Sequence, residues 1–396
     1  MLRRPNPSSR TCPDPSQRVG PSFLPRLLPL SLMVLVGPIL GSCGRPPIRI
    51  GVMGSFSSPS GIPGRLGARL AVAQINATGG VNGRLLELVE EDDKGMADSA
   101  VLVASSLVNS DVVAVIGSGF SGPTLAAAPI FNGASDPVLQ ITPSGSSPDI
   151  SEAGDWTFRT CPTDLAHAAT LARFVRKKLQ LDRGAVLYMN NAYGRGFRAV
   201  FEREFTGLGG TVVSADPYLA AQVQDAGPYV ELLARDGKAQ FIVAASYEPD
   251  GAELLRMVRA RGITVPFLAG DGVAGLEREG PVTEGAYQTA SYLANLQTPT
   301  NLAWVAQYRA AFPDQPPPSQ MAVGFYDAVR LVARLIGEVG TDRRALRDAL
   351  AQVGTTRPPF DGISGRIAFD SLGDVPDMRV LVGVTHNGVT SAVEGQ

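Results

Sequence analysis

Two loops in the first half of the chain combine hydroxyl groups with backbone amides. Residues 117–122 (GSGFSG) follow a short apolar segment and lead into a helix-forming run. Residues 142–148 (TPSGSSP) again follow an apolar segment and add hydroxyls and a close backbone approach. The free amides at a helix N-terminus and neighbouring hydroxyls suit an anion such as a carboxylate. These loops therefore predict an anion site.

The second half of the chain offers complementary chemistry. Loops at Tyr193-Gly194, at Tyr247 and at Asp271-Gly272 each follow an apolar segment. They supply two aromatic faces and one carboxylate, which suit a cation and the stem that carries it. An anion site and a cation site in one pocket are what a free amino acid requires.

Enzymatic alternatives use some of the same residues. Residues 117–122 match the dinucleotide pattern G-x-G-x-x-G, but Pro123 follows, and this is not the first strand–helix turn of its series. Residues 119–123 (GFSGP) resemble the nucleophile motif G-x-S-x-G of hydrolases but lack its last glycine. A catalytic triad would also have to recruit His167 or His386, and we expect His167 at a solvent-facing or capping position. An NAD-dependent or hydrolytic enzyme stays a remote alternative. We expect no enzyme activity and no cofactor.

Composition excludes several other classes of protein. The 396 residues include 35 Lys+Arg, 37 Asp+Glu, 2 His and 3 Cys, for a formal net charge of −2. A nucleic-acid binder would carry a basic excess, and a transition-metal site would need more His and Cys. The length predicts two domains, each with its own core.

The N-terminus has the layout of a secretory signal. Residues 1–26 carry five Arg and one Asp, and residues 27–40 are uncharged but too short to span a bilayer. Leu40-Gly41-Ser42-Cys43 resembles a bacterial lipobox, in which the cysteine receives lipid. We therefore predict a signal peptide over 1–42, lipidation at Cys43 and a tether over 43–47. The mature protein is expected on the periplasmic or extracellular face of the membrane.

The elements that must position the candidate site alternate between strands and helices. One series runs from a strand at 48–54 to a strand at 138–141, and a second runs from a helix at 165–179 to a strand at 267–269. Near-continuous apolar strands joined by helices are typical of parallel sheets covered on both faces. We expect an α/β protein with two doubly wound lobes. Ligands then bind beyond the carboxyl ends of the strands.

At these positions the chain resembles the leucine/isoleucine/valine-binding protein family, the extracytoplasmic receptors of amino-acid ABC transporters with a type I periplasmic-binding fold. The likeness covers about 48–389. The stretches that carry it are GAR at 67–69, INATGG at 75–80, VIG at 115–117, ITPS at 141–144, Tyr193-Gly194, Phe369-Asp370 and Gly373-Asp374.

The resemblance implies roles for six ligand-binding residues. Ser121 and Ser146 fall where the family holds the ligand carboxylate. The Gly145 carbonyl falls where the family accepts a hydrogen bond from the ligand ammonium. Asp271 stands where an acid, usually the longer Glu, faces that ammonium. The aromatic positions of the second lobe correspond to Tyr193 and Tyr247.

The resemblance also implies a three-strand hinge on which the lobes close over the ligand. The predicted first lobe comprises 48–164 and 288–364, and the second comprises 165–287 and 365–396. The crossovers are expected near Asp164, Tyr287 and Ser364.

Two departures from the family limit what is implied. The loop 55–64 is shorter than in branched-chain receptors and lacks their tryptophan, and the usual disulfide is absent, with Gly95 and Phe120 at those sites. We therefore predict a monomeric solute-binding lipoprotein for a branched-chain or other neutral amino acid, delivering it to an ABC permease. A ligand sensor of the same fold, acting through a signalling partner, is the alternative.

Overall fold

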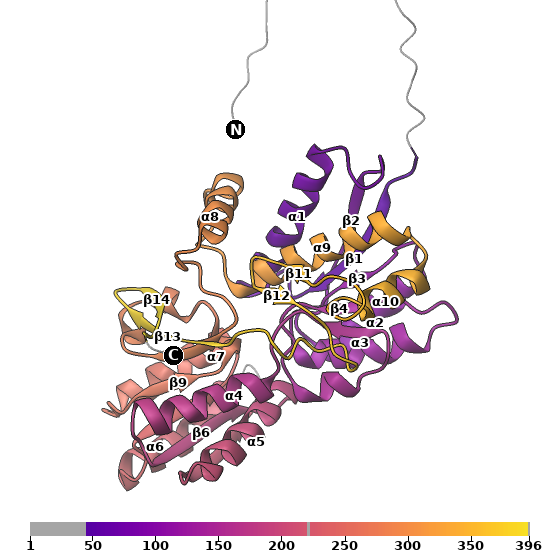
Figure 1. Cartoon of the computed structure of the whole chain (residues 1–396). Helices are drawn as coiled ribbons and strands as arrows, with labels where there is room; N and C mark the ends of the chain where they lie inside the picture. Colours follow the sequence, from indigo (N-terminus) through magenta and orange to yellow (C-terminus); the bar gives the residue numbers. More distant parts are fainter. Residues whose placement is uncertain (1–44, 220–221, 395–396) are drawn as a thin grey trace, which may run out of the picture. The chain divides into compact units, whose positions relative to one another are not determined.

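The computed structural model describes residues 45–219 and 222–394. The predicted signal peptide and Cys43 lie outside these residues. Two large sheets organise the described chain, and helices cover both faces of each (Figure 1). This confirms the predicted α/β architecture.

The first sheet has five parallel strands in the order β2-β1-β3-β4-β5. The strands are β1 (Ile48–Gly54), β2 (Leu86–Asp92), β3 (Val115–Ile116), β4 (Gln140–Thr142) and β5 (Thr157–Arg159). The helices associated with it are α1 (Ile62–Ala77), α2 (Ala97–Val108), α3 (Ser121–Gly133), α8 (Pro299–Ala311), α9 (Gln320–Val339) and α10 (Arg343–Ala351).

Side-chain alternation along β1 divides the first core into two layers. Ile50 and Val52 pack with α1 and α9, whereas Met53 packs with α2 and α3 on the opposite face. Gly67 has a packing role in α1, because a Cβ there would lie 1.9 Å from the Ala322 carbonyl oxygen of α9. The glycine thus lets the two helix backbones approach closely.

The second sheet has seven strands in the order β14-β13-β10-β9-β8-β6-β7. They are β6 (Arg183–Met189), β7 (Thr211–Tyr218), β8 (Phe241–Ala245), β9 (Phe267–Ala269), β10 (Tyr287–Ala290), β13 (Leu381–His386) and β14 (Val389–Ala392). One face packs on α4 (Asp164–Arg173) and α5 (Ala192–Gly207), and the other packs on α6 (Gly227–Asp236) and α7 (Glu248–Ala260). β7, β6, β8, β9 and β10 are parallel.

An antiparallel hairpin at the edge of this sheet was absent from the sequence prediction. β13 pairs with β10 and with β14, and His386 lies opposite Val389. The two residues between them, Asn387 and Gly388, both have positive φ. Asn-Gly is the pair that such a tight turn favours, so the sequence did carry a signal for it.

Two predicted lobe boundaries differ from the packing that the structure shows. β10 belongs to the second sheet, so the second crossover spans 291–298 rather than beginning at Tyr287. Beyond Ser364, four apolar side chains still pack in the core of the first sheet: Ile367, Phe369, Val375 and Met378. We therefore assign 48–163 with 291–378 to the first lobe, and 164–290 with 379–394 to the second. A small hairpin of β11 (Phe360–Asp361) and β12 (Arg366–Ile367) belongs to the first.

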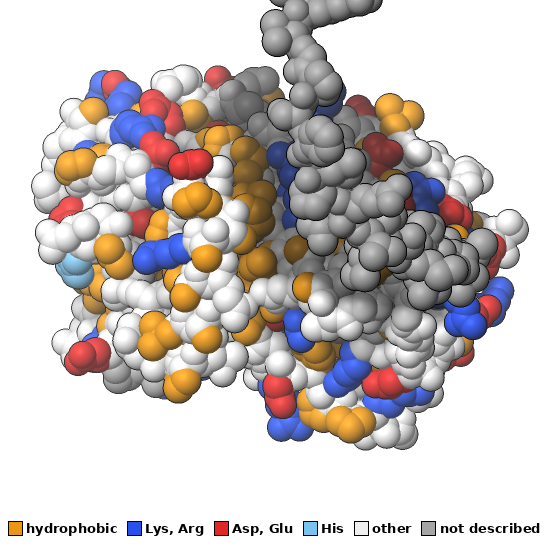
Figure 2. All heavy atoms as spheres, turned by 90° about the horizontal axis from the view of Figure 1, so that it is seen from above, with side chains coloured by type: hydrophobic (Ala, Val, Ile, Leu, Met, Phe, Trp, Pro, Cys, Tyr) orange, Lys and Arg blue, Asp and Glu red, His pale blue; other side chains and the backbone are white. Residues whose placement is uncertain are grey.

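Among the helices of residues 45–219 and 222–394, none is long and apolar enough to cross a membrane. On the face drawn in Figure 2, Lys and Arg side chains are intermixed with Asp and Glu, and hydrophobic side chains gather along a hollow. The charge pattern of that face gives no support to a nucleic-acid partner.

Candidate functional site

The predicted loops of the two lobes meet around one small cavity of about 20 Å³. Five of the six predicted ligand-binding residues line it: Ser121, Ser146, Tyr193, Tyr247 and Asp271. Each lies beyond the carboxyl end of a strand, where the rule for doubly wound sheets places ligands. The lobes touch here, since the Phe120 and Tyr247 ring centroids are 4.5 Å apart.

The first lobe contributes a helix N-terminus and hydroxyl groups. Ser121 is the first residue of α3, so the unpaired amides of this helix start at the cavity. The Ser121 hydroxyl accepts a hydrogen bond from the Ser147 amide at 3.1 Å, which joins the two predicted loops. Ser121 and Ser146 are both buried. This side of the cavity therefore presents donors to an anion.

Gly145 is the predicted residue that does not line the cavity. Its carbonyl accepts instead from Arg159 Nη1 at 3.3 Å and from Cys161 Sγ at 3.4 Å. Its neighbour Ser144 lines the cavity in its place. The role that the resemblance implies for Gly145 therefore stays a prediction.

Arg159 anchors this loop and was missed by sequence reasoning. Its side chain is 0% exposed and forms a 2.5 Å ion pair with Asp374. It also donates to the Ser147 carbonyl at 2.9 Å and to the Ser151 hydroxyl at 2.8 Å. A buried guanidinium with all these partners holds the serine loop against the segment of the first lobe that carries Asp374.

The second lobe contributes two stacked tyrosines. The rings of Tyr193 and Tyr247 are nearly parallel, 5.1 Å apart, at the starts of α5 and α7. The Tyr193 hydroxyl accepts from the Gly272 amide at 3.0 Å, which fixes the loop that carries Asp271. The Tyr247 hydroxyl is buried next to Ser121 of the first lobe, whose hydrogen bonding partly offsets the effect of burial on its pKa. Burial raises the pKa of both phenols, so both are neutral donors.

An acidic cluster lies behind this end of the cavity. Asp271 is 3% exposed, and its Oδ2 lies 3.8 Å from Nε2 of His167. His167 and Asp164 are fully buried on α4. The Ser146 side chain hydrogen-bonds the Asp164 carboxyl, whereas the His167 ring has no hydrogen-bond partner among the described residues. The solvent-facing or capping position expected for His167 was therefore wrong.

The charge state of this cluster follows from its burial. Burial, together with the nearby Asp271 charge, raises the pKa of Asp164 well above its usual range. Burial lowers the pKa of His167, an effect that the Asp271 charge partly offsets. A neutral imidazole and a carboxyl that resists ionisation leave Asp271 without a full countercharge. The cluster thus suits an entering cation.

Gln320 was also missed by sequence reasoning, although it connects both lobes at the cavity. From the first turn of α9 it donates through Nε2 to the Asp271 carbonyl at 3.0 Å. Its Oε1 accepts from the Ser291 amide at 3.1 Å, in the second crossover. No local pattern in the sequence marks a lone glutamine at a helix start as a contact between lobes.

Gly95 and Phe120, which stand at the family's disulfide positions, are neighbours, since a Cβ on Gly95 would lie 3.4 Å from the Phe120 ring. Cys161 is a buried free thiol whose pKa is raised by burial. Within the described ranges, no group of three or more His, Cys, Asp or Glu could hold a metal ion.

Comparisons with known proteins identify the family of the chain. The periplasmic binding protein family matches residues 47–381. A leucine-, isoleucine-, valine-, threonine- and alanine-binding protein of Pseudomonas aeruginosa is 30% identical over 379 residues, which is 94% of this chain and 98% of that protein.

Solved structures are similar over the same range. An ABC transporter substrate-binding protein of Desulfitobacterium hafniense in complex with Leu is 28% identical, with a TM-score of 0.74 over 88% of this chain and 100% of that one. A branched-chain amino acid transporter substrate-binding protein of Streptococcus pneumoniae in complex with isoleucine is 26% identical, with a TM-score of 0.78 over 87% of this chain and 98% of that one. The chain belongs to the periplasmic binding protein family, whose members bind solutes outside the cytoplasm rather than catalyse reactions.

Proposed function

We propose that this protein captures a free amino acid between its two lobes and presents it to an ABC permease. One observation carries the proposal: the N-terminus of α3, with Ser121, and the buried carboxylate of Asp271 line the same small cavity. Donors for an anion and a carboxylate for a cation, held close together, are complementary to the head group of a zwitterion.

The assignment of individual residues follows this polarity. Ser121 and Ser146 bind the ligand carboxylate through hydroxyl and amide groups. Asp271 accepts from the ammonium, and the Ser144 carbonyl takes the role that the resemblance gave to Gly145. Tyr193 and Tyr247 pack along the ligand.

Ligand capture is coupled to closure because the head-group partners come from both lobes. A ligand that contacts both lobes stabilises the closed population over the open one by the difference between its two binding free energies. The cavity now holds space for about one water molecule. A ligand therefore enters only when the lobes separate or side chains move.

Delivery to a permease is supported by the names of the relatives, several of which are ABC transporter substrate-binding proteins. The Pseudomonas relative is named for leucine, isoleucine, valine, threonine and alanine, so neutral amino acids are the first ligands to test. We further propose that lipid on Cys43 anchors the mature chain to the membrane. The lipobox-like residues 40–43 support this step.

A thermal-shift screen of the purified protein tests the proposed function. We expect one or more neutral L-amino acids to raise the melting temperature with a saturating concentration dependence, because a ligand that binds only the folded state stabilises it. The matched controls are the D-enantiomers at equal concentrations. No shift with any amino acid, together with a shift produced by NAD, would refute the proposal.

A further inference from the structure

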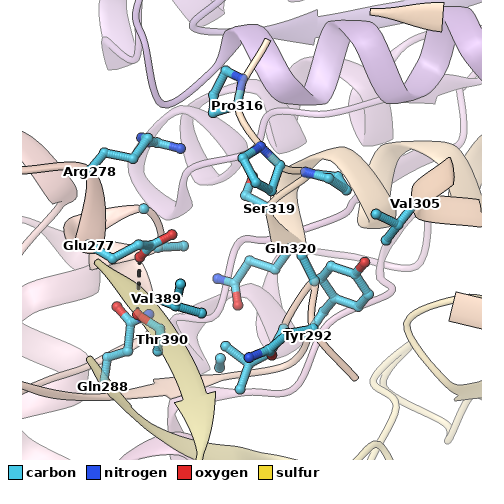
Figure 3. Close-up of a pocket in the computed structure, with 18 of the residues that line it drawn as sticks. Glu277, Arg278, Gln288, Tyr292, Val305, Pro316, Ser319, Gln320, Val389 and Thr390 are labelled. Atoms are coloured by element: carbon cyan, nitrogen blue, oxygen red, sulfur yellow. Dashed lines mark hydrogen bonds between the residues drawn. The ribbon is translucent and has the colours of Figure 1, made fainter. Parts of the chain in front are cut away.

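A second, larger space adjoins the head-group cavity. It has a volume of about 370 Å³ and lies beside the second crossover (Figure 3). The loop 274–278 of the second lobe forms one side, and α8 with the loop 316–319 of the first lobe forms the other. We call this space the side chamber. Its volume is within the range of small-ligand pockets.

Gln320 separates the side chamber from the head-group cavity. Only three residues line both spaces: Ala274, Ser319 and Gln320. In Figure 3 the Gln320 side chain projects between the walls of the chamber. Its amide is held by the Asp271 carbonyl and by Ser291, so the partition is attached to the loop of the proposed ammonium-binding residue. Rotation of this side chain would join the two spaces.

The chamber walls are mainly apolar, with a few polar groups. Tyr292, Leu293, Val305 and Val389 line it. Gln288 is 4% exposed, and its Oε1 has no hydrogen-bond partner among the described residues. A buried amide oxygen without a partner costs free energy in the folded protein.

Two cationic side chains, Arg278 and Arg309, line the chamber. The Arg278 guanidinium faces Glu248 only at 3.9 Å, which is beyond hydrogen-bond distance. Glu277 is engaged by the Thr390 hydroxyl at 3.2 Å. The chamber thus combines an apolar body with polar groups at its periphery.

From these observations we infer that the side chamber receives the side chain of the bound amino acid once Gln320 moves aside. The inference rests on the proposed function and names its substrate class. The ligand carries an extended, mostly apolar side chain of tyrosine or tryptophan size. A head-group cavity of about 20 Å³ alone offers no room for such a side chain.

A variant that fills the chamber gives the first test. Val389→Trp lies on the edge hairpin, where Val389 is 51% exposed, so a larger side chain is tolerated by the fold. The matched control is Val101→Trp, the same change on α2, where Val101 is 39% exposed and does not line the chamber. Isothermal titration calorimetry is run with L-alanine, L-leucine, L-phenylalanine, L-tyrosine and L-tryptophan.

We expect Val389→Trp to weaken the binding of tyrosine and tryptophan by about tenfold or more, because only large side chains need the volume that the new side chain fills. The affinity for alanine should change by less than about twofold. Gln320→Ala should shift the ratio of affinities toward the large ligands by about fivefold.

The outcomes separate the inference from the proposed function. If Val389→Trp changes the affinity for every ligand by the same factor, or changes no affinity, the inference is overturned. The chamber then serves only lobe closure or has no part in binding. If the wild-type protein binds alanine or leucine but neither tyrosine nor tryptophan, the inference is overturned and the proposed function stands. If the folded protein responds to no amino acid in the thermal-shift screen, the proposed function fails and the inference fails with it.

Discussion

Replacement of Asp271 by Asn isolates the charge that we assign to ammonium binding. The change keeps the size of the side chain and removes its negative charge at a position that is 3% exposed. Loss of one partner from a buried, hydrogen-bonded charge pair costs about 2–5 kcal/mol. Taking about 3 kcal/mol, we expect the Kd for the best amino acid to rise roughly a hundredfold.

The same variant should behave in the opposite way when no ligand is present. Asp271 faces Asp164 and His167 without a full countercharge, and its charge contributes to the raised pKa of Asp164. Neutralising Asp271 removes this repulsion, so the melting temperature of the ligand-free variant should not fall. A structural role for Asp271 would instead lower both affinity and stability.

Isothermal titration calorimetry and thermal unfolding measure these two quantities on the same samples. The matched control is Asp225→Asn, because Asp225 is exposed on the second lobe and does not line the cavity. The control should bind as the wild type does. A Kd for Asp271→Asn within about threefold of the wild-type value, which is less than 1 kcal/mol, would refute the ammonium assignment.

Three other predictions concern the buried charges and the anchor. The pKa of Asp164 is raised in the folded state. Between pH 3.8 and that raised pKa, the folded protein therefore binds more protons than the unfolded chain, and its stability falls as pH rises. Ligand-free Asp164→Asn should therefore melt at a higher temperature than wild type at pH 7, with the gap closing toward pH 3.8; an equal gap at both pH values would contradict this. Arg159→Met should lower the free energy of unfolding in urea by about 3 kcal/mol, since it leaves the carboxylate of Asp374 buried without its partner, and an unchanged midpoint would count against the anchoring role. Cys43→Ser should move the full-length protein from the membrane fraction to the soluble fraction of expressing bacteria, whereas retention at the membrane would argue against lipidation.

General rules of sheet topology explain why much of the site was predictable. Carboxyl ends of parallel strands meet at one edge of a sheet, so an apolar run followed by serines or tyrosines locates a cleft residue without knowledge of tertiary contacts. Ser121, Ser146, Tyr193, Tyr247 and Asp271 each follow such a run and do line the cavity.

What sequence reasoning missed depends on packing between distant segments. The Gly145 carbonyl turns away from the cavity because Arg159 and Cys161 donate to it. His167 is buried because α4 packs on the second sheet, which no local pattern around a lone histidine reveals. Gln320 reaches the site through hydrogen bonds with Asp271 and Ser291, which are 49 and 29 positions away in the chain.

The requirement for both charges of a zwitterion is tested most directly by calorimetric titration of the wild-type protein with its best amino acid and with two analogues. One analogue lacks the amino group, and the other lacks the carboxylate. We expect saturable binding of the amino acid and a loss of about a hundredfold or more for each analogue, because each leaves Asp271 or the α3 N-terminus without its partner. Equal affinity for the amino acid and either analogue would contradict the proposed zwitterion site.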